Sequence, residues 1–117
     1  MDTLTEYRSI IRRIVGEHLE YEPTEDNIET LALCDDAAGH YMLIEMGWRH
    51  PKRIHSLIFH ARLKDGKIWI ELDRTSPGIA RELLNAGVPP EAIELGFQPP
   101  EMRPHTELAE LIQQRPA

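Results

Sequence analysis

The sequence predicts an α+β domain: an N-terminal helix, a four-stranded antiparallel meander, a second helix, a short strand and an extended C-terminal segment. Three observations lead to this class. Apolar residues recur at helical spacing near the N-terminus, four later segments are rich in strand-forming residues, and the links between those segments are short. Short links favour antiparallel neighbours, because a parallel crossover needs about a dozen residues or more. The 117 residues predict a single domain spanning residues 1–117.

The first helix is expected to begin at Thr3, which has capping-box spacing from Glu6. Apolar residues at three- and four-residue steps then predict one buried face: Leu4, Tyr7, Ile10, Ile11, Ile14 and Val15. A polar run over residues 20–27, which contains Pro23, predicts the end of this helix.

Four strands are predicted over residues 28–34, 41–48, 53–63 and 68–73. Asp65-Gly66 between the last two is the strongest short hairpin signal, because both central residues of a type I′ turn need positive φ. A two-residue loop gives a register with apolar pairs that we expect in the core: Leu63 with Ile68, Ala61 with Ile70, and Phe59 with Leu72. On the opposite face, the same register places Arg62 beside Trp69 and His60 beside Glu71.

After the strands, the sequence predicts a second helix, a short strand and a proline-rich segment. Ser76 is expected to cap the helix and Gly87 to end it, and its apolar face contains Ile79, Leu83 and Ala86. The short strand is placed at residues 94–97. Residues 98–104 are expected to be extended, because a residue that precedes proline avoids the helical region. Residues 106–117 are expected to form a flexible tail or a short helix that begins at Thr106.

The composition predicts a soluble cytoplasmic protein. No apolar run approaches the ~20 residues that cross a bilayer, and the N-terminus lacks the profile of a signal peptide. The one cysteine, Cys34, cannot form an internal disulfide, which fits a reducing compartment. The net charge of −7 opposes free binding to DNA phosphates. We therefore expect no membrane contact, and contact with DNA only through a complex.

The polar residues do not form a complete catalytic or metal-binding pattern. Of the six histidines, His55 and His60 fall on opposite faces of one predicted strand, and no zinc-ligand spacing occurs. Cys34 has no basic or histidine neighbour in sequence, which favours a buried apolar role over a nucleophile. The sequence therefore predicts a protein that is not an enzyme and that has no cofactor or metal.

Two alternatives remain open. Glu71 and Asp73, at the end of a strand, are candidates for the carboxylates of a metal-dependent nuclease or phosphatase; the simpler interpretation is that Glu71 pairs with His60 and Asp73 holds the turn into the second helix. The basic residues Arg49, Lys52 and Arg53 lie at a hairpin end, close to Trp48. They are candidates for direct, weak contact with DNA, although a solvated turn also explains them.

Seven segments along most of the chain form a recognisable series: Tyr7-Arg8-Ser9-Ile10-Ile11, Ile44-Glu45-Met46-Gly47-Trp48, Lys52-Arg53-Ile54-His55, Asp65-Gly66-Lys67-Ile68-Trp69-Ile70-Glu71-Leu72-Asp73, Gly78-Ile79-Ala80, Leu83-Leu84-Asn85-Ala86-Gly87-Val88-Pro89 and Leu95-Gly96-Phe97-Gln98-Pro99-Pro100-Glu101-Met102-Arg103. In their order and spacing these segments resemble the XisI family. The resemblance implies a controlling factor for excision of the fdxN DNA element during heterocyst differentiation. It also implies a protein partner, XisH, and a separate recombinase that performs the strand chemistry.

A protein-binding surface is therefore expected to carry the function. The candidate residues are the polar hairpin face and the proline-rich segment after it: Arg62, Trp69, Asp73, Phe97, Pro99, Pro100 and Arg103. Arginine and aromatic residues dominate the energetics of interfaces, which favours Arg103 and Phe97 as anchors. Because a small sheet leaves edges that must be covered, and two-fold homodimers are the commonest soluble assembly, we also expect a homodimer.

Overall fold

The computed structural model describes residues 2–22, 25–76 and 78–105. These residues form α1 (Thr3–Tyr21), β1 (Ile28–Asp35), β2 (His40–Arg49), β3 (Lys52–Lys64), β4 (Lys67–Asp73), α2 (Ile79–Asn85), η1 (Pro90–Ala92), β5 (Ile93–Leu95) and η2 (Pro100–His105). The strands lie in the order β1-β2-β3-β4-β5, and β5 is parallel to β4 while the other neighbours are antiparallel. The α+β class and the meander are confirmed, and the short strand extends the sheet by a fifth member.

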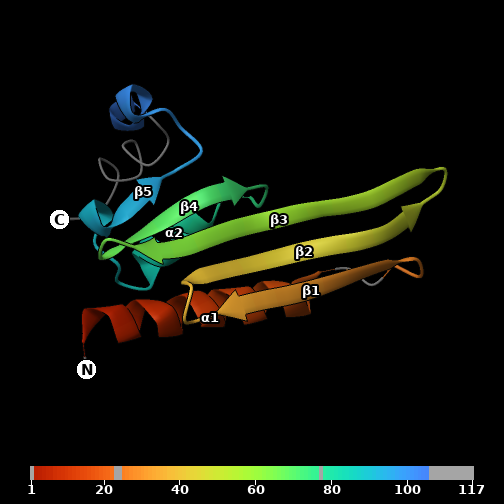
Figure 1. Cartoon of the computed structure of the whole chain (residues 1–117), viewed down its shortest axis with the longest axis horizontal. Helices are drawn as coiled ribbons and strands as arrows, with labels where there is room; N and C mark the ends of the chain where they lie inside the picture. The colour runs from red at the N-terminus through yellow and green to blue at the C-terminus, as the bar shows by residue number, and fades with distance from the viewer. Residues whose placement is uncertain (1, 23–24, 77, 106–117) are drawn as a thin grey trace.

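Both helices pack on one face of the sheet (Figure 1). Ile11 of α1, Leu83 of α2 and Phe59 of β3 line the same small internal space. The two helices are also joined by a polar contact, in which His18 Nε2 lies 2.7 Å from Glu82 Oε2. The core is therefore a single layer between the helices and the sheet. None of the helices in the described part of the chain is long and apolar enough to span a membrane.

Helix α1 buries the predicted stripe but begins with a different cap. Tyr7, Ile11, Ile14 and Val15 are buried, whereas Leu4 in the first turn is exposed. The N-cap is Asp2, whose Oδ1 accepts the N–H of Thr5 at 2.9 Å. The predicted capping box of Thr3 and Glu6 is wrong because the helix is capped one residue earlier, and the N–H of Glu6 already bonds the carbonyl of Asp2 at 3.2 Å.

The β3–β4 hairpin has the predicted turn, with positive φ at both Asp65 and Gly66. The pairs of Leu63 with Ile68 and of Ala61 with Ile70 are confirmed. The third predicted pair is wrong, because a β-bulge at Glu71 inserts one residue into β4. Beyond the bulge, Phe59 lies opposite Asp73, and His60 lies opposite Leu72.

The connection into α2 also differs from the prediction. Ser76 is not the cap: the N-cap position is Gly78, with φ +115°, and the carboxylate of Asp73 accepts the N–H of Ile79 at 2.8 Å. Helix α2 ends at Gly87 as predicted, where the N–H of Val88 returns to the carbonyl of Leu83 at 3.0 Å in a Schellman motif.

The C-terminal part differs in one segment. The predicted short strand is present, shifted toward the N-terminus, as β5. The expected extended conformation of residues 98–104 is wrong, since η2 covers most of it and the N–H of Met102 bonds the carbonyl of Pro99 at 2.9 Å. Pro100 is tolerated as the first residue of this helix, because the N–H that a proline lacks has no intrahelical partner at that position. The predicted tail at 106–117 lies outside the described residues.

Candidate protein-binding surface

The face of the sheet opposite the helices carries a group of apolar side chains. Side chains alternate across a strand, so the residues that follow buried Tyr41 and Leu43 in β2 point away from the helices. The pairing register places further residues of β1 and β3 on the same face. We call it the open face; its apolar members are Leu31, Leu33, Met42, Ile44 and Leu57. These five side chains are partly or well exposed, and Leu33 retains 46% of its accessible surface.

Arg62 and Trp69 lie next to this group on the open face, where they are directly opposite each other in the β3–β4 register. Arg62 Nε lies 2.8 Å from a carboxylate oxygen of Glu71, an ion pair that is not aligned as a hydrogen bond. The indole N–H of Trp69 donates to the carbonyl of Lys64 at 3.1 Å, and the Lys64 ammonium lies 5.5 Å from the ring centroid. The predicted placement of Arg62 beside Trp69 is therefore confirmed.

Asp73 does not belong to this surface. It lies opposite buried Phe59, on the helix side, and its carboxylate accepts the N–H of Thr75 at 2.9 Å as well as that of Ile79. Its role in the turn into α2 is the simpler of the two interpretations drawn from the sequence. Glu71 forms its ion pair with Arg62, and His60 lies opposite Leu72, so the other part of that interpretation, the pairing of Glu71 with His60, is wrong. The bulge separates the two carboxylates that a nuclease or phosphatase site would bring together.

The candidate residues after β5 lie beyond the β5 edge of the sheet and are separate from the open face. Phe97 retains 48% of its accessible surface, and Pro99 and Pro100 are exposed. The structure describes the backbone of Arg103, which lies in η2, but not its side chain. Figure 1 shows η2 standing beyond β5, away from the centre of the sheet. The predicted set is therefore divided between the open face and this C-terminal segment.

A histidine pair on the open face was not predicted from the sequence. His40 Nδ1 lies 2.9 Å from His60 Nε2, and Met42 lies in the same row of side chains. Burial, and next the charge of His40, lower the pKa of His60. Only the β2–β3 register brings these two histidines together, and the sequence left that register unassigned. Within the described ranges, no three histidine, cysteine, aspartate or glutamate side chains are placed to hold a metal ion.

The predicted basic cluster lies at the tip of the β2–β3 hairpin. Arg49 is neutralised by Glu25, since its Nη2 lies 2.9 Å from Oε1 of that side chain. Trp48 retains 46% of its surface and is covered on the Arg53 side, where the guanidinium carbon lies 5.6 Å from the ring centroid. Lys52 and Arg53 are both exposed. Only two of the three predicted cations are thus available to a partner.

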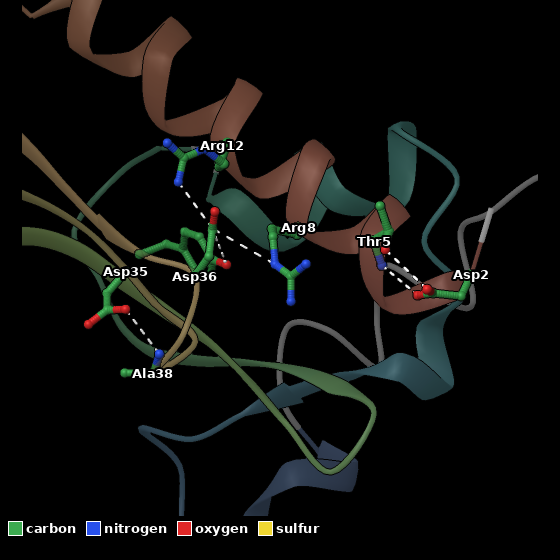
Figure 2. Close-up of polar contacts among 8 residues, drawn as sticks. Asp2, Thr5, Arg8, Arg12, Asp35, Asp36 and Ala38 are labelled. Carbon is green, nitrogen blue, oxygen red and sulfur yellow. Dashed lines mark hydrogen bonds and ion pairs between the residues drawn. The ribbon is translucent and has the colours of Figure 1, made fainter.

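A polar cluster at the opposite end of the sheet joins α1 to the β1–β2 link (Figure 2). Asp36 accepts a hydrogen bond from Tyr41 Oη at 2.9 Å and one from Arg12 at 3.1 Å, and Arg8 Nε lies 3.8 Å away. These contacts, led by the bond from Tyr41, lower the pKa of Asp36. Asp35 accepts the N–H of Ala38 at 3.0 Å and closes the turn. The cluster fixes the helix against the sheet and leaves the open face on the far side.

Comparison with known proteins agrees with this architecture. The chain is similar over 89% of its length to a XisI-like protein from Anabaena variabilis, with 31% identity, a TM-score of 0.84 and 95% of that chain covered. It is also similar to the fdxN element excision controlling factor XisI from Anabaena variabilis, with 34% identity, a TM-score of 0.80, and 91% and 96% of the two chains covered.

No curated protein matches the chain. The model of the XisI protein family matches residues 1–110, which is nearly the whole chain. The resemblance noted in the sequence is therefore confirmed, and the chain belongs to the XisI family.

Proposed function

We propose that this chain is a non-catalytic controlling factor for the excision of a DNA element and that it acts by binding an XisH-like protein. One of its structural relatives is described as an fdxN element excision controlling factor. A factor can control excision without cutting DNA by binding the proteins that cut it. The feature of this chain that supports such a role is the open face.

The open face has the composition of an interface. Its apolar centre, Leu31, Leu33, Met42, Ile44 and Leu57, is bordered by Trp69 and Arg62. Contiguous exposed apolar patches with a polar rim mark interaction sites on small proteins. Arginine, methionine and tryptophan are enriched at such sites. This exposed apolar sheet face is the observation that carries the proposal.

A substitution at the centre of the open face tests the proposal. The Leu33→Glu variant should lose binding of the XisH-like protein from the same genome, because burying an unpaired carboxylate in an apolar interface is costly. Leu19→Glu is a matched control, since Leu19 retains 37% of its surface but lies on α1. Co-purification and calorimetry compare the two variants with the parent. The proposal is wrong if the parent does not bind the XisH-like protein, or if both variants bind it equally well.

Self-association is a second part of the proposal. A two-fold homodimer would use the same patch on both copies. Pairing through the open face would bury its apolar centre between the two copies until another protein competes for it. Sedimentation equilibrium of the parent and of Leu33→Glu measures this state. A parent that stays monomeric at all concentrations contradicts the homodimer while leaving binding of the XisH-like protein untouched.

A further inference from the structure

Strand β3 has an edge that is only half paired. It runs from Lys52 to Lys64, but β4 pairs only with the part between Phe59 and Lys64. Figure 1 shows β3 continuing well beyond the end of β4. In the described part of the chain, residues 52–57 have β2 on one side and no strand on the other. We call this stretch the free edge.

The backbone groups that face outward along the free edge can be assigned. In an antiparallel pair, alternate residues exchange both hydrogen bonds with the neighbouring strand, and the others point away from it. Trp48, which lies opposite Arg53, sends its N–H away from β3 to the carbonyl of Asn27 at 2.8 Å. At the inner end of the free edge, the carbonyl of Leu57 accepts the guanidinium of Arg74 at 2.9 Å. The N–H and C=O groups of Arg53 and His55 therefore point outward.

The charge of the free edge is positive, although the whole chain has a net charge of −7. The nearest carboxylates already have partners: Glu25 binds Arg49 at 2.9 Å, and Glu45 lies 3.6 Å from Arg74. Lys52 and Arg53 are exposed, and within the described residues neither lies in an ion pair. Two cations without a carboxylate partner thus lie together at the outer end of this unpaired stretch of backbone.

We propose that the free edge binds an extended, acidic segment of a partner protein, which adds as a strand beside β3. Strand addition takes its affinity from main-chain hydrogen bonds, and its specificity comes from side chains at alternate positions. Carboxylates on the added strand would lie beside Lys52 on one face and Arg53 on the other. A second copy of this chain fits less well, because it brings the same cations to the edge. Lysine and arginine on an exposed edge also discourage such self-pairing.

Model peptides test the proposal directly. The probe is a blocked peptide about six residues long, the usual length of a strand, with adjacent glutamates that place carboxylates on both faces and valine at the other positions. We expect it to slow hydrogen exchange at the amides of Arg53 and His55 and to leave that of Ile54, which already faces β2, unchanged. A control peptide with lysine in place of glutamate should bind about tenfold more weakly or worse. A control that is N-methylated along one edge should not bind.

Variants at the free edge distinguish binding through backbone hydrogen bonds from binding through side chains. His55→Pro removes one outward N–H, which a strand edge tolerates, whereas His55→Ala keeps it. We expect the proline variant to lose the peptide and the alanine variant to keep it. If the proline variant does not fold, Arg53→Glu serves instead and should favour the lysine peptide. The proposal is overturned if both His55 variants bind alike, if the N-methylated peptide binds, or if duplex DNA and not the peptide protects these amides.

The inference rests on the proposed function only for the identity of the partner, so the two can fail separately. If His55→Pro still captures the XisH-like protein at full affinity, the free edge is not its docking site, while the controlling role stands. If the parent captures no XisH-like protein but binds the acidic peptide as described, the proposed function fails and the free edge remains a site for acidic strands.

Discussion

A single inserted residue, Glu71, decides which side chains reach the core and which reach the open face. Before the bulge, Ile68 and Ile70 are buried as the hydrophobic alternation predicts. After it, Leu72 is only partly buried and joins His60 on the opposite face. Alternation and turn chemistry predicted the first two pairs correctly. They could not predict the bulge, because no local signal in residues 68–73 marks where the extra residue is placed.

This difference between Ile70 and Leu72 can be measured. Ile70→Ala should lower the free energy of unfolding by about 2–5 kcal/mol, because Ile70 is 1% exposed and its removal leaves a cavity. Leu72→Ala is the matched control and should cost clearly less, since its side chain is already partly in contact with solvent. Urea unfolding monitored by circular dichroism gives both values. Equal losses at the two positions would contradict the placement of Leu72 on the open face.

At the same scale, the histidine pair makes stability depend on pH. Burial and then His40 lower the pKa of His60 from its ordinary value of 6.5, so the unfolded chain binds this proton more readily than the folded one. The contribution of neutral His60 to the free energy of unfolding is therefore fully present above pH 6.5, and it is lost as the pH falls toward the lowered pKa. His60→Gln should flatten this part of the curve, and exposed His55→Gln should not. If the His60→Gln variant shows the same dependence of stability on pH as the parent, His60 is not the cause of that dependence.

At the scale of elements, the loop between α1 and β1 is tied to β2 through a glycine. Gly47 has φ +146°, and a Cβ there would overlap the carbonyl oxygen of Asn27, which accepts the N–H of Trp48. The sequence predicted the helix, the strands and the hairpin turn, since each depends on neighbours in the chain. It did not predict this close approach, nor the contact of His40 with His60, because both depend on pairing between separate elements.

Two glycine substitutions check this argument. Gly47→Ala should destabilise the protein by about 1–3 kcal/mol, since both the backbone angle and the contact with Asn27 exclude a side chain. Gly16→Ala should stabilise it by up to about 1 kcal/mol, because Gly16 lies in α1 with no atom near its would-be Cβ. Thermal unfolding of the two variants measures both changes in stability. If both variants change stability by similar amounts in the same direction, the loop does not constrain Gly47.

At the scale of the whole molecule, the two proposed binding features are on the side of the sheet that the helices leave uncovered. Helices α1 and α2 share the buried face, and the open face and the free edge of β3 adjoin each other at Leu57. A partner could therefore bury the apolar centre and pair with the free edge at the same time. The sequence predicted Arg62 and Trp69 as part of this surface, but assigned Asp73 to it wrongly because the bulge reverses the face of that residue.

The same distribution of charge predicts that the isolated protein binds duplex DNA weakly at physiological salt. The net charge of −7 repels the phosphates, and Arg49 at the hairpin tip is already neutralised by Glu25. With only Lys52 and Arg53 available there, the logarithm of the binding constant should fall with the logarithm of salt concentration with a slope of roughly −2. Fluorescence anisotropy of a labelled duplex measures both affinity and slope, and a variant with glutamine at both positions should lose the residual binding. Specific DNA-binding proteins reach dissociation constants of about 10⁻⁸ M or tighter. Affinity in that range for one sequence would mean that this chain reads DNA itself and does not depend on a partner to reach it.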